Sequence, residues 1–300
     1  MIPEAPGVPT ACGVLPVDKP VGPTSFAAVQ IVRRAFGLRA AGHAGTLDPR
    51  ASGLLVLCVG RATRLADMLM DGDKIYRASV RLGVETDTDD TEGRPVATAP
   101  VPALDRVRVE AVLESFIGRI EQIPPAFSAI KRHGQPLYRR ARRGEELSPE
   151  PRPVTIHRID LIGMREDGLE LEVECGKGTY IRALARDLGR SLGPRGHLAA
   201  LRRTRCAGFD VEQAITFDAL AASDPEALAA RLVTPLDAFP GLTRRLLTED
   251  ELGRVGCGQA VDANEQHPDG ATVLLVSPAG TLAAVAKAFG GLLQPHRVFV

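Results

Sequence analysis

The sequence of 300 residues predicts an α+β fold that is followed by a small β-rich module. Apolar residues recur at helical spacing over 26–36 and 181–192, a run at 169–174 alternates strictly, and the region 240–300 is rich in hairpin signals. The length suits one large domain plus a small one. With 44% apolar and 25% charged residues, the chain has the composition of a globular protein that buries a sizeable core.

The N-terminal elements can be placed in order. Residues 1–11 contain three prolines and lack a signal-peptide pattern, so they indicate a short disordered lead-in. Pro23-Thr24-Ser25 supplies turn and N-cap chemistry for the helix over 26–36, and Gly37 ends that helix. A glycine-rich loop follows, and the continuous apolar run 54–59 then predicts a buried strand.

The middle of the chain alternates strands with polar segments. Residues 76–82 predict a second strand, and the acidic, threonine-rich stretch up to Gly93 indicates a loop. An amphipathic helix is predicted over 107–117. Pro124-Pro125 breaks the pattern, and the basic segment that follows, up to Pro153, indicates an excursion from the compact body.

Strand signals return in the second half of the chain, at 155–164. Asp167-Gly168 is a good hairpin turn, and the alternating run 169–174 suits a half-buried strand. After the helix over 181–192, a proline-bearing connection leads to the C-terminal module. There the sequence predicts a short helix at 248–254 and a hairpin over 271–286.

Charge is segregated along the chain, although the formal net charge is zero. Six basic residues and no acidic one lie from Lys131 to Arg143, and eight basic residues against one acidic residue lie from Lys177 to Arg205. Residues 85–92 hold five acidic side chains. The last predicted helix also carries arginines at i, i+4 and i+8, namely Arg182, Arg186 and Arg190. A basic face of this kind either binds a polyanion such as RNA or is ordinary solvated surface. The arginine stripe has three possible interpretations, a face toward RNA, toward the active site or toward water.

Several classes of function have no sequence support. The five cysteines form neither a metal knuckle nor a disulfide framework, which fits free thiols in a reducing cytoplasm. The chain has no phosphate-binding loop, zinc helix or nucleophile elbow, and its six histidines are scattered. No apolar run approaches the ~20 residues of a membrane span. We therefore expect chemistry by side chains alone, with no metal and no cofactor.

The loop Gly42-His43-Ala44-Gly45-Thr46-Leu47-Asp48-Pro49 is the most unusual local stretch. Its two glycines permit tight backbone conformations, and three polar side chains stand beside the predicted buried strand. Such loops often hold functional residues. The alternative is that Asp48 caps a turn ahead of Pro49, which is common.

Several separated segments, in order, resemble one family. They cover most of residues 13–210 and depart in small ways at Ala44 and Gly176, and they comprise 13–20, 42–49 with 51–53, 74–77, 82–90, 123–131, 178–182 and 201–204. This ordered set is similar to the TruB family of bacterial tRNA pseudouridine-55 synthases. The region after 235 resembles the family's PUA-like tail by position and hairpin content rather than by motif.

The resemblance implies a fold and a division into domains. The pseudouridine synthase fold has a mixed, mainly antiparallel central sheet flanked by helices. The catalytic domain would span 12–235, with a tRNA-clasping insertion at about 122–153. A small PUA-like RNA-binding domain would occupy 240–300.

The resemblance also implies a reaction, which is isomerisation of the uridine at position 55 in the TψC loop of tRNA to pseudouridine. Asp48 would be the catalytic carboxylate, Arg182 its ion-pair partner and Tyr76 the ring on which the flipped base stacks. Lys19 would brace the loop. His43, Tyr180 and Leu201 would contact the substrate, and the insertion would touch the tRNA backbone of the T stem-loop through Lys131, Arg132, Arg139, Arg140, Arg142 and Arg143. We expect a cytoplasmic monomer that uses no guide RNA.

Three alternatives stay open. One is a guide-RNA-dependent homologue, although the chain lacks basic tails. A second is an RNA-binding or tRNA-folding protein that keeps the scaffold without activity. A third is a glycosidase that uses paired carboxylates from residues 85–92, although the chain has three tyrosines, no tryptophan and no apparent sugar platform.

Overall fold

The structure is a computed structural model that describes residues 11–128, 131–132, 135–136, 140, 143, 145 and 149–300, with only the backbone at 131, 132 and 136. The expected lead-in therefore lies outside the described residues except for Ala11, which is buried. Among the described residues, no helix is both long and apolar enough to cross a bilayer.

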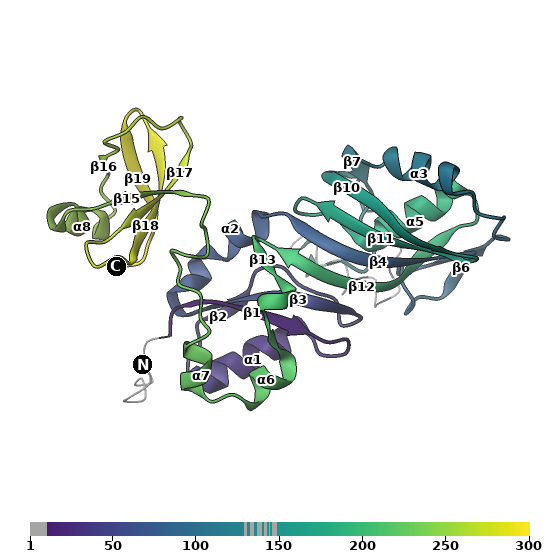
Figure 1. Cartoon of the computed structure of the whole chain (residues 1–300), viewed down its shortest axis with the longest axis horizontal. Helices are drawn as coiled ribbons and strands as arrows, with labels where there is room; N and C mark the ends of the chain where they lie inside the picture. Colours follow the sequence, from purple (N-terminus) through teal and green to yellow (C-terminus); the bar gives the residue numbers. More distant parts are fainter. Residues whose placement is uncertain are drawn as a thin grey trace.

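A ten-stranded sheet forms the body of the molecule (Figure 1). Its main strand order is β14-β1-β3-β12-β4-β11-β10-β7, with β2 paired to β3 and β13 paired to β12. Only the β1–β14 and β3–β12 pairs are parallel, so the prediction of a mixed, mainly antiparallel sheet is confirmed. The strands are β1 (Gly13–Lys19), β2 (Ala41–His43), β3 (Ala51–Val59), β4 (Lys74–Leu82), β7 (Gly118–Gln122), β10 (Arg152–Arg165), β11 (Gly168–Cys175), β12 (Gly196–Cys206), β13 (Phe209–Asp210) and β14 (Ile215–Thr216).

The pattern of apolar residues along each strand matches the burial of its side chains. Almost every residue of β3 is buried, as its continuous apolar run predicts, whereas β11 alternates buried and half-buried residues. The β10–β11 hairpin is confirmed, although its two turn residues are Glu166 and Asp167, one position earlier than predicted. The central strand β12 was not predicted, because its charged sequence does not resemble a buried strand.

Helices cover the sheet at two places. α1 (Ser25–Phe36) packs beside β3 and α6 (Phe217–Ala222), with its N-cap at Thr24 and a left-handed Gly37 at its end, as predicted. At the other end of the sheet, α5 (Ile181–Leu192) lies on β12 and β4 beside α3 (Arg106–Glu114) (Figure 1). Shorter helices are η1 (Gly60–Leu65), α2 (Ala66–Asp71), η2 (Val211–Gln213) and α7 (Pro225–Ala229).

The acidic stretch after β4 is a hairpin rather than a simple loop. Its strands are β5 (Val84–Thr86) and β6 (Pro95–Thr98), and it lies beside β12. Glu85 and Asp89 are buried there, at 6% and 5% exposure. The prediction of a loop up to Gly93 was therefore wrong for β5, because arginines of α5 neutralise the buried carboxylates.

The C-terminal module has its own five-stranded sheet, with the order β15-β17-β18-β19-β16. Its elements are β15 (Thr243–Leu246), α8 (Glu249–Gly256), β16 (Val261–Asp262), β17 (Thr272–Val276), β18 (Leu282–Phe289) and β19 (Leu292–Val298). Leu274, Val285 and Phe299 of this module share a hydrophobic cluster with Leu54 and Leu65 of the body. Arg61 and Arg64 of η1 also donate to backbone carbonyls at the C-terminal end.

Candidate active site

The loop after β2 is fastened to the start of α1. The buried hydroxyl of Ser25 accepts a hydrogen bond from the backbone N–H of Leu47 and donates one to its carbonyl, each at 2.9 Å. The backbone N–H of Gly22 donates to the carbonyl of Pro49 at 2.8 Å. Lys19 is fully buried and donates to two carbonyls of the turn before α1. Burial lowers the pKa of Lys19, and the charge of Asp48 opposes this shift.

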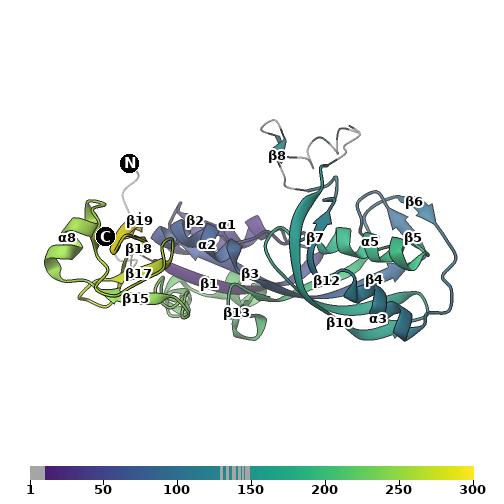
Figure 2. The same ribbon diagram turned by 90° about the horizontal axis from the view of Figure 1, so that it is seen from above.

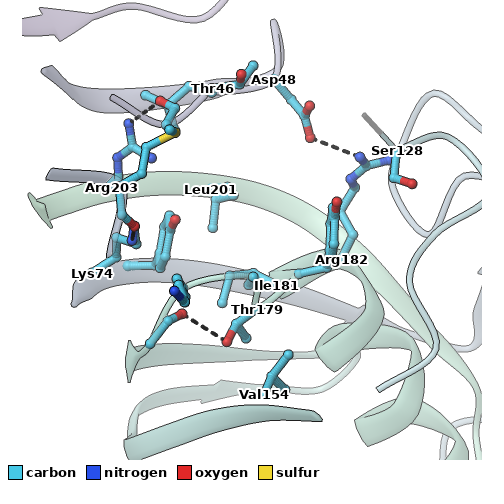
Figure 3. Close-up of a pocket in the computed structure, with 18 of the residues that line it drawn as sticks. Thr46, Asp48, Lys74, Ser128, Val154, Thr179, Ile181, Arg182, Leu201 and Arg203 are labelled. Carbon is cyan, nitrogen blue, oxygen red and sulfur yellow. Dashed lines mark hydrogen bonds and ion pairs between the residues drawn. The ribbon is translucent and has the colours of Figure 1, made fainter. Parts of the chain in front are cut away.

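The carboxylate of Asp48 forms an ion pair with Arg182, the second residue of α5. Its Oδ2 lies 3.1 Å from Nη2 of Arg182, as the dashed line in Figure 3 marks. The Asp48 side chain is 48% exposed, whereas that of Arg182 is only 9% exposed. A half-exposed carboxylate beside a buried cation stays accessible to a substrate, and the cation balances its charge.

Further hydrogen bonds hold the guanidinium of Arg182 in place. Nη1 donates to the carbonyl of Thr88 at 3.1 Å and to the Asp90 carboxylate at 3.4 Å. Nη2 donates to the carbonyl of Phe127 at 3.0 Å. These partners come from the acidic hairpin and from the segment after β7, so two separate parts of the chain determine where Arg182 meets Asp48.

A cavity of about 720 Å³ opens beside this ion pair. Asp48, Arg182, Tyr76, Tyr180 and Leu201 all line it, so five of the residues predicted from the sequence come together. Cavities of about 300–1,000 Å³ are typical of small-ligand sites. Tyr76 is 8% exposed, and burial raises its pKa while the positive charge of Arg203 opposes the shift. Burial likewise raises the pKa of Tyr180.

His43 is not among the residues that line the cavity. It ends β2, opposite Leu57 of β3, and is half-buried. Its Nδ1 is buried and has no hydrogen-bond partner among the described residues. Burial lowers the pKa of His43, and the charge of Arg203 lowers it further.

Sequence reasoning did not assign a role to Arg203, a cavity residue that is 1% exposed. Its Nε donates to the carbonyl of Leu54 at 2.7 Å and its Nη2 donates to the carbonyl of Gly45 at 3.0 Å. Arg203 therefore ties the loop at 42–49 to β3. The motif 201–204 was recognised, but only its first residue was given a function, because nothing local shows that the third side chain is buried.

The arginine stripe and the acidic run are partners. Arg186 pairs with Asp89 at 2.8 Å and Arg190 pairs with Glu85 at 2.5 Å. Ion pairing with Arg190 lowers the pKa of Glu85, whereas burial raises that of Asp89 to about 6. Of the three expectations for the stripe, a face toward the active site describes Arg182, which lines the cavity, whereas none of the three describes the buried Arg186. The glycosidase alternative also loses support, because the buried Glu85 and Asp89 are committed to arginines.

The predicted insertion emerges between two paired strands, because Gln122 at the end of β7 lies opposite Arg152 at the start of β10. Two short strands belong to it, β8 (Lys131–Arg132) and β9 (Gln135–Pro136), and β8 stands away from the sheet in Figure 2. Of the predicted contacts to the tRNA backbone, Arg140 pairs with Glu145 and Arg143 is exposed. Lys131 and Arg132 are described by backbone only, and Arg139 and Arg142 lie outside the described residues.

Solved structures share this architecture. A chain in the structure of an H/ACA RNP bound to a substrate RNA containing 2'-deoxyuridine matches with a TM-score of 0.75 and 23% identity, over 97% of this chain and 86% of that one. A chain of a Cbf5-Nop10-Gar1 complex matches with a TM-score of 0.74 and 25% identity, over the same shares. Residues 33–181 match the model of the TruB family pseudouridylate synthase N-terminal domain. This fold, together with the match to that family model, defines a pseudouridine synthase.

Curated relatives narrow the class. The chain is 51% identical to tRNA pseudouridine synthase B of Aromatoleum aromaticum, over 78% of this chain and 75% of the relative. It is 43% identical to the protein of the same name from Syntrophotalea carbinolica, over 90% of each. Residues 182–239 match the tRNA pseudouridylate synthase B C-terminal domain. The chain belongs to the TruB family.

The boundary between the two matched segments does not separate two folding units. The second segment begins at Arg182, inside α5, and contains the central strand β12. Since β12 lies between β3 and β4 of the first segment, the two segments complete one sheet and one cavity.

Proposed function

We propose that this protein isomerises the uridine at position 55 in the TψC loop of tRNA to pseudouridine, with Asp48 as the catalytic carboxylate. The observation that carries the proposal is the Asp48–Arg182 ion pair of 3.1 Å at the edge of the cavity that Tyr76 lines. Curated relatives at 42–51% identity are tRNA pseudouridine synthases B, which supports tRNA as the substrate and uridine isomerisation as the reaction.

The reaction breaks the N-glycosidic bond of the uridine, turns the freed base and joins C5 of the base to the ribose. The proton on C5 is lost to solvent and the one gained is at nitrogen, so atoms and electrons balance within one nucleotide. One carboxylate is sufficient, as a nucleophile or as a base at the sugar. Arg182 keeps the negative charge of Asp48 balanced in a site from which RNA excludes water.

The cavity suits a base that has left the helical stack. Flipping a base out of folded RNA costs a few kcal/mol, and stacking on an aromatic ring offsets part of this cost. We assign this stacking role to Tyr76, with Tyr180 and Leu201 as the walls. His43, on β2 beside the catalytic loop, would contact RNA next to the flipped nucleotide rather than the base inside the cavity.

RNA outside the cavity would meet the basic insertion and the C-terminal module. We assign phosphate contacts on the T stem-loop to the insertion residues 131–143, and an RNA-binding role to the PUA-like module at 240–300. In this proposal the protein acts as a monomer and without a guide RNA, because the insertion itself supplies basic residues for holding the stem-loop.

The test is release of tritium from C5-labelled uridine in tRNA transcripts. The wild type should release tritium, and Asp48→Asn should release none. Asp73→Asn is the matched control, because Asp73 is similarly exposed and pairs with His157 outside the proposed machinery. Full turnover by Asp48→Asn would contradict the assigned role. Binding of tRNA without release by the wild type would favour the RNA-binding or tRNA-folding alternative, and mapping the product tests position 55.

A further inference from the structure

Two arginines of α5, one turn apart, hold the segment through which the insertion leaves the sheet. Arg186 Nη2 donates to the carbonyl of Ile123 at 2.9 Å. Arg182 Nη2 donates to the carbonyl of Phe127 at 3.0 Å. These carbonyls lie at the two ends of a five-residue segment, 123–127, that connects β7 to the basic insertion. We call this segment the insertion root.

The insertion root is stiff. Its second and third residues are Pro124 and Pro125, and both are buried. Each proline ring restricts its own φ angle, and each also limits the residue before it. Because few backbone angles between Ile123 and Phe127 can change, a displacement of one end of the root moves the carbonyl at the other end.

Arg186 is itself firmly held. It is 7% exposed, and its Nη1 donates to the Asp89 carboxylate at 2.8 Å. Its Nε and Nη2 donate to the two oxygens of Asp187 at 2.8 and 3.2 Å. An arginine fork with this many partners is a rigid anchor, unlike a lysine with one ammonium group.

The other end of the root reaches the reacting groups. The Arg182 nitrogen that donates to Phe127 is Nη2, the same atom that lies 3.1 Å from Oδ2 of Asp48. The carbonyl of Phe127 therefore helps to set the position of the catalytic ion pair. A loose root would let Arg182 shift away from Asp48, and small misplacements of catalytic groups reduce rates strongly.

We propose that Arg186 is a positioning residue for the isomerisation: by anchoring Ile123 it fixes the insertion root, whose Phe127 carbonyl holds Arg182 beside Asp48. This inference rests on the proposed function. In this proposal the insertion has a second role besides contacting RNA. Bound RNA that displaces the insertion would also displace the insertion root, and through it the Asp48–Arg182 ion pair.

The test compares Arg186→Lys with Arg190→Lys. Both variants keep a positive charge on the same face of α5. Lysine at 186 has a single nitrogen, so it cannot reproduce the hydrogen bonds that three guanidinium nitrogens give to Asp89, Asp187 and Ile123 together. Arg190 is the matched control, since it donates to Glu85 at 2.9 and 2.5 Å and none of its described hydrogen bonds reaches the insertion root.

The measurement is the single-turnover rate of tritium release with enzyme in saturating excess, together with tRNA affinity and Tm. We expect Arg186→Lys to slow the rate about 10- to 100-fold at saturation, so that the loss is in kcat rather than in KM. The rate of Arg190→Lys should stay within about twofold of the wild-type rate, even if its Tm falls as much as that of Arg186→Lys. Should Arg186→Lys fail to fold, the double variant Arg186→Met/Asp89→Asn, which removes both charges of the Arg186–Asp89 pair, is measured in the same way.

Equal rates in Arg186→Lys and Arg190→Lys would overturn the anchoring role. So would a loss that appears only in tRNA affinity. A wild type that releases no tritium would instead refute the proposed function, so the two failures are distinguishable.

Discussion

Replacement of Ser25 by alanine tests how the catalytic loop is held. In the wild type one buried hydroxyl serves both the N–H and the carbonyl of Leu47, each at 2.9 Å. Alanine leaves both backbone groups without a partner, and each such group costs about 1–3 kcal/mol. Because the desolvation of the hydroxyl is also removed, we expect the free energy of unfolding to fall by about 2–4 kcal/mol.

Leu47 directly precedes Asp48, so the same change should slow isomerisation. Thr24→Ala is the matched control on the neighbouring residue, because it removes the N-cap bond to Ala27 at 3.2 Å without touching the loop. That bond contributes about 1 kcal/mol. Urea titration gives the two free energies, and single-turnover tritium release gives the rates. If Ser25→Ala were no less stable than Thr24→Ala and turned over at the wild-type rate, the bracing argument would be refuted.

Three further outcomes are expected. Gly53→Ala should lower the free energy of unfolding by more than about 3 kcal/mol in urea titration, because φ is +100° and the new Cβ would collide with the carbonyl of Arg203. Gly178→Ala, at φ +84° with open space around it, should lower it by about 1 kcal/mol. Equal losses in the two variants would contradict this reasoning. Burial raises the pKa of Asp89 to about 6, so the protonated carboxyl contributes its full stability below the unfolded pKa, and this contribution is lost as pH rises through about 6. The Tm of Asp89→Asn minus the Tm of the wild type should therefore increase from about pH 5 to about pH 8. A constant Tm difference would count against the raised pKa. Neutralising Arg143, which we assign to phosphate contact, should reduce the slope of log Kd against log salt by about one, and an unchanged slope would contradict that assignment.

Local sequence patterns were sufficient for many elements. Thr24, the helical apolar spacing and Gly37 specify α1, since capping and periodicity act within one helix. The alternation over 169–174 likewise predicted β11 and its hairpin with β10. In both cases the determining contacts lie between residues close in sequence, so single-sequence reasoning can find them.

Elements that depend on distant partners were not predictable in this way. β12 carries three arginines in the run 202–205, yet it is the central strand, because Arg203 is satisfied by carbonyls of β3 and the catalytic loop. β5 is buried only because α5 supplies Arg190 to Glu85. Each segment alone has the composition of exposed surface, and its burial depends on partners 105 to 158 residues away in the chain.

The sequence by itself determined the family and the reaction it implies, and it predicted Asp48, Tyr76 and Arg182 as site residues, because ordered motifs can be recognised without coordinates. Only the tertiary structure decided that Arg182 meets Asp48 at 3.1 Å, that His43 lies outside the cavity, and that Arg186 and Arg190 pair with the buried carboxylates of Asp89 and Glu85. The physical reason is that charge balance and burial are properties of packed side chains. The local sequences around Glu85, Asp89, Arg186 and Arg190 are unremarkable. These four side chains become a fixed network only when the sheet brings α5, the acidic hairpin and the insertion root together.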